Sequence, residues 1–468
     1  MFRDLKPYDE YRPIPGLPLP VPAAWSVRPM RSLIESRSER GRGDLPLLTV
    51  ARERGVFVRS KDDANHNAIP EDLSNYKVAR AGDLVINKMK AWQGSLGLAP
   101  TDGIVSPAYF VYDFKIDERE YGQALLRSRA YVSLMGAASD GVRVGQWDLA
   151  IPRFRAIPVL VPSRAEQAAI VKYLGHAHAR IDRAIAAKRK LVALLEEQKR
   201  AIINQAVTRG IDPTVPMKDS GIPWLGKIPA RWETVPLKRI GRYKSGAGFP
   251  VSFQGKMEGD IPFAKVSDMN RAGNEEWIHA AESTVTRSEA RELSAFVFPR
   301  NTIVFPKVGG ALLTNKRRRL ARPACVDNNV MGAILDETAL NPDFSFLMMI
   351  VLDLGKLAKP GPVPAIGEGD VREIRVAVPP LPEQGMIVDH VQSATRAVDE
   401  ARSRITSEVD LLREFRTRLT SDVVTGQLDV REIAALLPDF VEQAAVDADS
   451  GEDESFDELD EVLEEAEG

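Results

Sequence analysis

The feature that most constrains this chain is a long helical run that occurs twice. One copy follows Pro379-Pro380-Leu381-Pro382-Glu383-Gln384 and continues from Ile387 to Val424 with no internal proline or glycine. Pro382 fixes the backbone for a first helical turn, and Glu383 favours the positive end of the helix dipole. The apolar residues recur in a four-three rhythm, which makes a narrow seam for one partner helix. We therefore expect a long helix that packs against another helix.

The partner helix is predicted earlier in the same chain. Pro162-Ser163-Arg164-Ala165-Glu166-Gln167 opens a similar run, and Glu166, Leu195 and Thr208 match Glu383, Leu412 and Thr425 at one offset of 217 residues. A single run of this kind is typical of an ordinary amphipathic helix. Two copies at a constant offset favour an intramolecular antiparallel coiled coil. At about 1.5 Å per residue, each helix would be roughly 60 Å long.

A second repeat shows that the duplicated unit is larger than the helix. The segment 21–25 ends in Trp25 and returns as the segment 228–232, which ends in Trp232. We interpret each tryptophan as a buried anchor at the start of a domain. Short strand and helix patterns fill both intervals between tryptophan and helix. The expected fold class is α+β, with two mixed α/β domains separated by two long helices in an antiparallel coiled coil and related by an internal pseudo-twofold repeat.

The pattern divides the chain into six segments. They are a first domain over 1–160, a first long helix over 161–208, a linker over 209–223, a second domain over 224–378, a second long helix over 379–432, and an acidic tail over 441–468 that we predict to be disordered.

Charge is distributed unevenly along the chain. Residues 441–468 contain 13 Asp and Glu and no Lys or Arg, so residues 1–440 carry 63 basic against 53 acidic side chains. A basic body suits a polyanionic partner, although proteins without a nucleic-acid role can carry a similar excess. No apolar stretch is long enough to span a membrane and no signal peptide is evident, so we expect a cytoplasmic protein. The single cysteine, Cys325, excludes an internal disulfide.

Two clusters in the first domain combine long polar side chains with tryptophan. One is the loop 88–95 and the other lies at 143–147. Lys and Arg can contact phosphates or guanine, and Gln can pair with adenine, so both clusters suit a groove-reading surface. A solvated loop with one buried tryptophan explains them equally well. The candidate DNA contacts are Lys88, Lys90, Trp92, Gln93, Arg143 and Gln146, with Trp147 beside them.

The second domain contains the most basic cluster of the chain, Asn315-Lys316-Arg317-Arg318-Arg319. The segment 301–307 repeats the strand that leads to Lys88, and it ends at Lys307. A solvated basic loop is one explanation for the cluster, and a loop that contacts phosphates is the other. The candidate DNA contacts here are Lys244, Lys307, Asn315, Lys316, Arg317 and Arg318.

Motifs for catalysis are missing from the sequence. It has no His-Glu-x-x-His motif, no phosphate-binding loop, no Gly-x-Ser-x-Gly elbow and no Cys/His metal spacing. It also lacks the Asn-Pro-Pro-Tyr and Asp-Pro-Pro-Tyr tetrapeptides expected of an enzyme that methylates the amino group of a base. We therefore predict a chain that recognises DNA without chemistry of its own, with no catalytic, cofactor-binding or metal-binding residues.

These motifs resemble the specificity subunit of type I restriction-modification enzymes over about residues 7 to 432. The resemblance rests on the two Glu-Gln helix starts, on the domain-entry segment 220–232, and on the helix ends Val207-Thr208-Arg209-Gly210 and Val424-Thr425-Gly426. The first copy departs from the usual form, since Val161-Pro162-Ser163 stands where two prolines are common.

The resemblance implies a non-catalytic subunit with two target-recognition domains, each of which reads one half of a split, asymmetric double-stranded DNA site. It implies two partner modification subunits that methylate adenine with S-adenosylmethionine, and ATP-dependent restriction subunits can join them. S-adenosylmethionine, ATP and Mg would thus bind to partners and not to this chain. Two alternatives remain. One is a single-chain or two-component restriction enzyme with its own catalysis, and the other is a coiled-coil scaffold that does not bind DNA.

Overall fold

The computed structural model describes residues 5–59, 72–143, 146–358 and 363–439. It contains two compact units. Unit 1 comprises Met1–Lys188 and Ser407–Gly468, and unit 2 comprises Arg189–Thr406. The acidic tail predicted over 441–468 lies outside the described residues.

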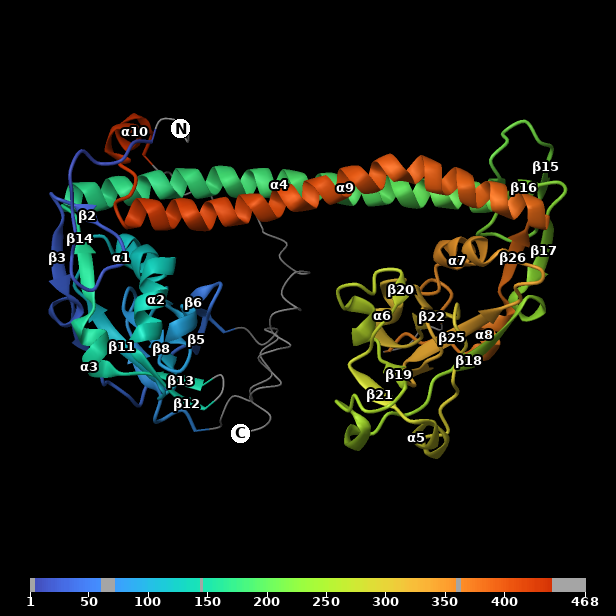
Figure 1. The fold of residues 1–468 in the computed structure, drawn as a ribbon, viewed down its shortest axis with the longest axis horizontal. Coiled ribbons are helices and arrows are strands. Elements are labelled where there is room, and N and C mark those ends of the chain that lie inside the picture. Colours follow the sequence, from blue (N-terminus) through green and yellow to red (C-terminus); the bar gives the residue numbers. More distant parts are fainter. Residues whose placement is uncertain (1–4, 60–71, 144–145, 359–362, 440–468) are drawn as a thin grey trace. The chain divides into compact units, whose positions relative to one another are not determined.

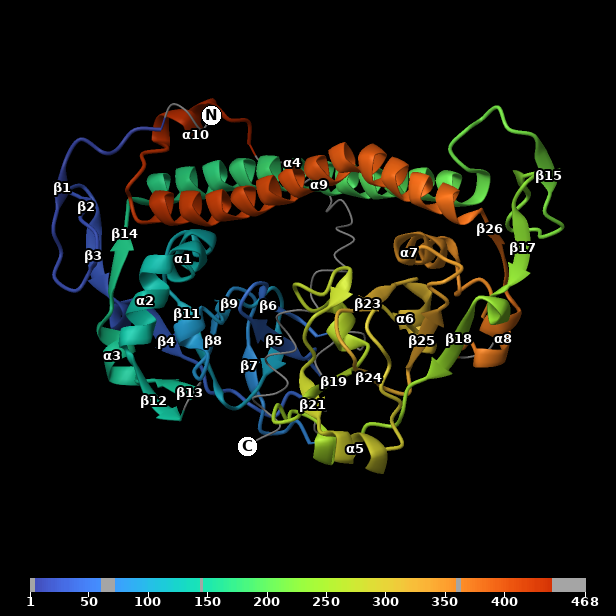
Figure 2. The same cartoon turned by 45° about the vertical axis from the view of Figure 1, so that its right-hand side comes forward.

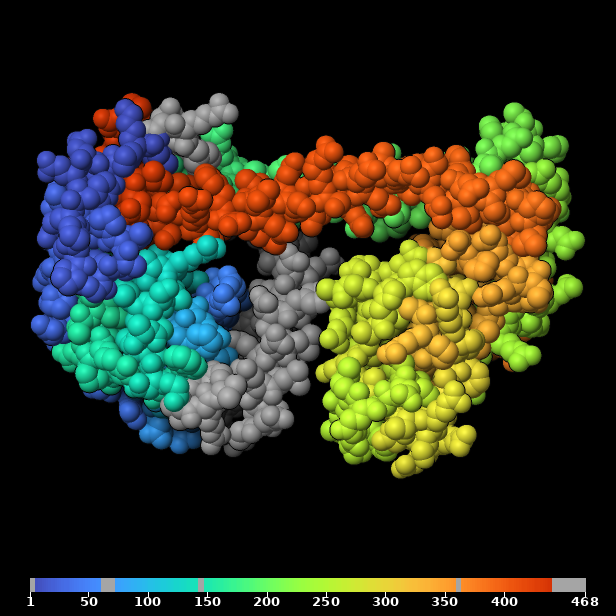
Figure 3. All heavy atoms as spheres, in the orientation of Figure 1, coloured from blue at the N-terminus to red at the C-terminus, as the bar shows by residue number. Residues whose placement is uncertain are grey.

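Two long helices, α4 (Arg164–Arg209) and α9 (Leu381–Val424), contribute to both units. They lie side by side in Figures 1 and 2. Their ion pairs show an antiparallel arrangement, because successive residues along α4 pair with residues of α9 whose numbers decrease. These pairs are Asp182–Arg416 at 3.1 Å and Lys188–Glu408 in unit 1, and Lys199–Asp399 at 2.7 Å in unit 2. The space-filling view shows that α9 keeps one face uncovered along its length (Figure 3).

The second helix is shorter than the span predicted from the sequence, which was 379–432. Gly426 has a φ of 75°, a left-handed conformation that glycine adopts readily and that ends a helix. The chain then turns and forms a separate short helix, α10 (Arg431–Leu436). The helix predicted over 161–208 spans Arg164–Arg209.

Unit 1 is built around one antiparallel sheet. Its strand order is β4-β11-β8-β9, with bounds Ile34–Ser36, Tyr109–Phe114, Leu84–Asn87 and Leu96–Leu98. Five two-stranded pairs surround it: β1–β2 (Tyr11–Arg12, Val21–Pro22), β3–β14 (Ser26–Pro29, Pro158–Val161), β5–β6 (Leu48–Ala51, Gly55–Val58), β7–β10 (Lys77–Ala79, Gly103–Val105) and β12–β13 (Ser139–Arg143, Gln146–Leu149). The short helices are η1 (Met30–Ser32), η2 (Ala91–Gln93), α1 (Arg119–Leu126), α2 (Arg129–Ala137) and α3 (Ile151–Ala156).

Unit 2 contains a larger sheet with a related order, β18-β25-β22-β23-β20. Its bounds are Gly241–Ser245, Val330–Leu335, Ile303–Pro306, Arg318–Leu320 and Trp277–Ile278. The other strands are β15–β16 (Met217–Asp219, Lys227–Pro229), β17–β26 (Glu233–Pro236, Arg375–Val378) and β21-β19-β24 (Ser283–Val285, Ile261–Ala264, Cys325–Val326). The helices are η3 (Leu237–Arg239), η4 (Val251–Phe253), η5 (Ser267–Asn270), α5 (Arg287–Glu292), α6 (Gly309–Leu313), α7 (Pro342–Val351) and α8 (Glu368–Glu373).

The strand pairing repeats between the units. The antiparallel order β4-β11-β8-β9 in unit 1 corresponds to β18-β25-β22-β23 in unit 2, and the pair β3–β14 corresponds to β17–β26. Both β14 and β26 lead directly into a long helix. This architecture confirms the predicted α+β class, with two mixed domains and two long helices packed together.

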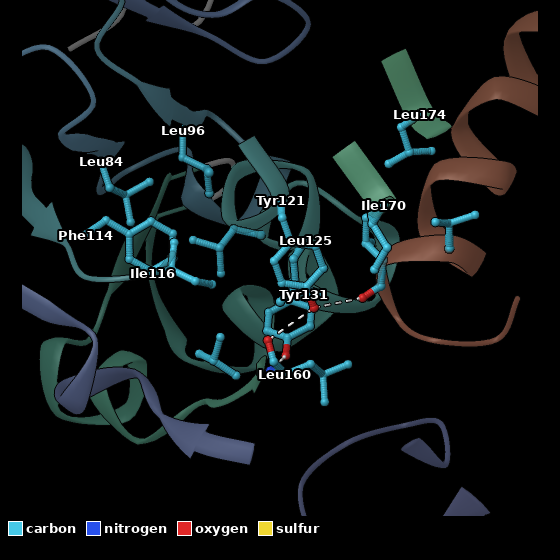
Figure 4. Packing of buried hydrophobic residues seen from close by; sticks show 14 of the residues in the cluster. Leu84, Leu96, Phe114, Ile116, Tyr121, Leu125, Tyr131, Leu160, Ile170 and Leu174 are labelled. Atoms are coloured by element: carbon cyan, nitrogen blue, oxygen red, sulfur yellow. Dashed lines mark hydrogen bonds between the residues drawn. The ribbon is translucent and has the colours of Figure 1, made fainter. Parts of the chain in front are cut away.

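The core of unit 1 continues from the sheet to α4. Tyr121 and Tyr131 point toward the same strand in Figure 4, where Tyr121 donates a hydrogen bond to Leu160 O (3.2 Å) and Tyr131 accepts one from Leu160 N (3.1 Å). Ile170 of α4 lies beside Tyr121 and is fully buried. The sheet and the first turns of α4 therefore share one core.

The first turn of α4 is joined to the domain through Glu166. Its Oε1 accepts hydrogen bonds from Trp25 Nε1 (2.9 Å) and from the Tyr8 hydroxyl (2.7 Å). Gly426, just beyond α9, packs on the same tryptophan, because a Cβ there would lie 3.0 Å from the Trp25 ring. Gln167 binds Pro162 O through Nε2 (2.9 Å) and accepts from the backbone N of Glu118, the N-cap residue of α1 (3.1 Å). We call this arrangement the tryptophan joint.

Unit 2 repeats the tryptophan joint with Trp232, Glu383 and Gly210. Gln384 again binds the carbonyl five residues before it, Pro379 O (2.9 Å), and accepts from the N-cap residue of a helix, Asn341 of α7 (2.7 Å). The tryptophan contact differs, because Trp232 Nε1 is buried without a partner in the described part of the chain and Glu383 instead pairs with the Arg231 guanidinium (2.8 Å). The Glu-Gln motif thus connects each domain to its long helix.

Among the described residues, no helix has the length and apolar character needed to cross a membrane.

The two joints predict different responses to the same substitution. Trp25→Phe removes a donor from a buried carboxylate, whereas Trp232→Phe removes an N–H group that has no partner. We expect Trp25→Phe to lower the free energy of unfolding by about 1–2 kcal/mol more than Trp232→Phe does. Urea unfolding of the full chain measures both, and equal losses would contradict the role of the Trp25–Glu166 bond.

His178 of α4 makes unit 1 sensitive to acid. Its Nε2 lies 2.8 Å from Thr420 Oγ1, whose hydroxyl donates to Arg416 O (2.8 Å), so His178 acts as the donor. Burial lowers the pKa of His178 to about 4, Arg416 acts in the same direction, and Asp182 opposes them. At a pH between the two pKa values, His178 is therefore protonated in the unfolded chain and neutral in the folded chain.

We expect the free energy of unfolding to fall as the pH drops from 6.5 toward 4, by up to about 3 kcal/mol from His178. His178→Gln keeps a donor but cannot titrate, so it should flatten this part of the profile. Urea unfolding at several pH values measures the slope, with His176→Gln as the matched control. Parallel profiles for His178→Gln and the wild type would contradict the prediction.

Candidate nucleic-acid interface

The structure brings together the two clusters predicted in the first domain. Lys88 follows β8, and its Nζ pairs with Asp148 Oδ2 of β13 at 3.1 Å. The backbone N of Leu149 donates to Lys88 O (3.0 Å), and the rings of Trp92 and Trp147 lie 5.9 Å apart between centroids. Segments that are more than 50 residues apart in the sequence thus form one surface region of unit 1.

The remaining predicted residues of unit 1 flank this region. Lys90 is the N-cap residue of η2, and Lys90, Trp92 and Gln93 are all half-buried. Arg143 and Gln146 are backbone partners at the end of the β12–β13 hairpin. The side chains of Arg143 and Gln146 lie outside the described part of the structure, so their prediction as DNA contacts is untested.

In unit 2, Lys307 occupies the position that corresponds to Lys88. It follows β22, the counterpart of β8, and its Nζ donates to Ser245 Oγ at 2.9 Å. A lysine ammonium has three donors, so each of these lysines keeps hydrogen-bonding capacity for an anionic acceptor. The same fold position therefore presents a cation in both units.

Lys244 does not converge with Lys307, although both were predicted as contacts. Lys244 and Ser245 are consecutive on β18, so their side chains point to opposite faces of the sheet. The Lys244 ammonium lies 4.3 Å from the centroid of the Phe296 ring, and its side chain is exposed. Lys244 could thus serve a surface different from that of Lys307.

The cluster 315–318 is less exposed than the sequence suggests. Arg317 is only 3% exposed, and its guanidinium donates to Met349 O (3.1 Å), Leu352 O (2.9 Å) and Asn315 Oδ1 (2.8 Å). Burial lowers the pKa of Arg317 to about 9. These bonds occupy the guanidinium inside the domain, so we no longer expect Arg317 to contact DNA.

Its neighbours have mixed environments. Arg318 is half-buried and donates to Met269 O from both Nε (3.1 Å) and Nη2 (2.9 Å), and burial lowers its pKa. Asn315 adopts a φ of 53° and accepts from Arg317, which gives it a structural role. Lys316 binds the side chain of Asn270. Of this cluster, Lys316 is the residue placed best for an outside partner.

Sequence reasoning missed the residues that hold the predicted cations in place. Asp148 and Ser245 fix the two lysines, but nothing in the local sequence marks them as partners because each lies far from its lysine along the chain. Among the described residues, no three His, Cys, Asp or Glu side chains are grouped to hold a metal ion.

The burial of Arg317 leads to a stability prediction. Arg317→Ala removes donors from Met349 O and Leu352 O and opens a cavity beside Phe305, whose ring centroid lies 5.1 Å from the guanidinium. We expect a loss of about 2–4 kcal/mol in the free energy of unfolding. Lys316→Ala is the matched control and should change stability little. If Arg317→Ala unfolds in urea like the wild type but binds DNA more weakly, the prediction is wrong and Arg317 contacts DNA.

Comparisons with known proteins find relatives of one kind. The family model of the type I restriction modification DNA specificity domain matches residues 229–410. The chain is 21% identical over 364 residues to the type I restriction enzyme MjaVIII specificity subunit of Methanocaldococcus jannaschii, an alignment that covers 76% of this chain and 78% of the relative.

A solved structure shares the fold. It is a chain from work described as the structural basis of complex assembly and conformational transition of the type I R-M system, with a TM-score of 0.56 and 13% identity. The match covers 87% of this chain and 99% of that chain. These findings confirm the resemblance stated from the sequence and the expectation of a non-catalytic subunit. The chain is similar to the specificity subunits of type I restriction-modification systems, and residues 229–410 match the DNA specificity domain of that family.

Proposed function

We propose that this chain selects the DNA site of a type I system by reading a split, asymmetric sequence. Unit 1 reads one half-site and unit 2 reads the other. The observation that carries this proposal is the repeated domain, with four strands in a corresponding order, a tryptophan joint in each unit and a lysine at the same strand end.

The differences between the units support two unlike half-sites. Around Lys88, unit 1 carries Asp148 and a tryptophan pair, whereas Lys307 of unit 2 meets Ser245. Base edges are distinguished by the donors and acceptors that face them, so different surroundings favour different sequences. Two domains of one fold can in this way recognise two sequences.

The partners in this proposal are double-stranded DNA and two modification subunits that methylate adenine, with ATP-dependent restriction subunits in the larger assembly. S-adenosylmethionine, ATP and Mg bind to those subunits, and the complex acts in the cytoplasm. The isolated chain should therefore have no methylating activity.

The experiment that tests the proposal is base-resolved mapping of adenine methylation. Cells that express the partner methyltransferase are compared with and without this chain. We expect a split motif that disappears when the chain is absent. The same methylation in both cell lines would contradict the proposal and favour a scaffold without a DNA role.

Variants of Lys88 and Lys307 can show which unit reads which half-site. Lys88→Ala should weaken or relax recognition of one half of the motif, and Lys307→Ala should affect the other half, by about 1–3 kcal/mol if each lysine contacts a base. A loss that is uniform across sequences, with a shallower salt dependence, would indicate phosphate contacts instead. Lys218→Ala, on the exposed strand β15, is the control. Unchanged binding in both lysine variants would remove them from the interface.

A further inference from the structure

Trp147 is an unusually exposed tryptophan in unit 1. Its residue is 41% exposed, whereas the two anchor tryptophans, Trp25 and Trp232, are at most 1% exposed. Exposed aromatic surface is unfavourable in water, and a large aromatic side chain on a surface often marks a binding site. Trp147 is not part of the buried hydrophobic cluster of unit 1, so packing in the core gives no reason for a tryptophan at this position.

The residue opposite Trp147 in the hairpin is a glycine. Trp147 on β13 is the backbone partner of Gly141 on β12, which has no side chain to place over the ring. A Cβ at position 141 would lie 3.8 Å from Trp147 Cε2, in ordinary contact distance. Any larger residue at that position would therefore cover part of the indole.

The ring of Trp92 packs against the indole of Trp147. The two rings lie 5.9 Å apart at an angle of 36°, and Trp92 belongs to the short helix η2. Trp92 Nε1 is buried and has no hydrogen-bond partner among the residues that the structure describes. Its N–H group is therefore not available to an outside ligand, and its ring serves to position Trp147.

Ion pairs fix both strands of the hairpin. Lys88 pairs with Asp148, the residue after Trp147, and Arg153 of α3 pairs with Asp140 of the opposite strand. The backbone bond from Leu149 N to Lys88 O adds a third connection. Trp147 is thus presented on a supported surface, beside a lysine.

An aromatic face beside a cation suits a nucleotide, since the cation can approach the phosphate while the ring contacts the apolar part of a base or sugar. We propose that Trp147 makes an apolar contact with a base pair in the half-site of unit 1, and that Trp92 is a positioning residue for it. This inference rests on the proposed function. It changes the role of Trp92 from the DNA contact predicted from the sequence to a support.

The test compares Trp147→Ala and Trp147→Phe in the complex with the methyltransferase. Trp224→Ala is the matched control, because Trp224 of unit 2 is 40% exposed. Methylation is mapped at base resolution, and binding is measured on a duplex that carries the mapped motif. We expect Trp147→Ala to weaken binding about tenfold and to relax at least one position of a single half-site, because the substitution removes the apolar contact with one base pair. The control should keep the motif and the affinity.

Trp147→Phe keeps an aromatic contact with Trp92, so it decides the question if Trp147→Ala does not fold. It should show a smaller loss of affinity in the same half-site, and the quenching of tryptophan emission by DNA should be weaker than in the wild type. Urea unfolding verifies the fold of each variant.

The outcomes separate this inference from the proposed function. If the wild type directs methylation to a split motif and folded Trp147 variants keep the same motif and affinity, the inference is wrong and the proposed function stands. If the variants bind DNA normally but lose the methyltransferase, the indole contacts a protein and the inference is wrong. If the wild type directs no motif-specific methylation, the proposed function itself fails.

Discussion

The tryptophan joint is the interaction on which the architecture depends. In unit 1, the buried carboxylate of Glu166 accepts from Trp25 and Tyr8, and Gly426 packs against the same indole. The Trp25 side chain therefore contacts both the first turn of α4 and Gly426, just beyond the end of α9. Because a buried carboxylate without donors is strongly unfavourable, the joint permits few other arrangements of helix and domain.

The second copy uses different chemistry for the same purpose. Arg231 donates to Glu383, while Trp232 supplies only its ring, and Gly210 takes the place of Gly426. The residue that corresponds to Arg231 in the first copy is Ala24, which has no charge to offer. In unit 1, the Arg431 guanidinium approaches Glu166 to 3.9 Å from beyond the end of α9. The two copies of the joint thus use different donors, but in each copy the glutamate carboxylate has a partner.

The residues predicted to contact DNA show why basic sequence clusters need a structure before they are assigned to an interface. Arg317 and Lys316 are adjacent in the chain, but one is buried among carbonyl groups and the other reaches the side chain of Asn270. By contrast, Lys88 and Lys307 lie outside this basic cluster and follow corresponding strands in the two sheets. A position that recurs in two domains is stronger evidence for function than local charge density.

The sequence by itself determined the elements whose signals are periodic or repeated. The apolar rhythm of the two runs predicted α4 and α9, and the constant offsets predicted two related domains, because helix formation and repetition depend on residues that are near in the chain or copied within it. It also located Trp25 and Trp232 as anchors, and both are buried. Only the tertiary structure decided which cations are exposed, that Asp148 and Ser245 hold the two lysines, and that Trp147 lies open above Trp92. These properties arise from contacts between segments far apart in the chain, and burial, which sets whether an arginine faces water or carbonyl groups, has no local signature in the sequence.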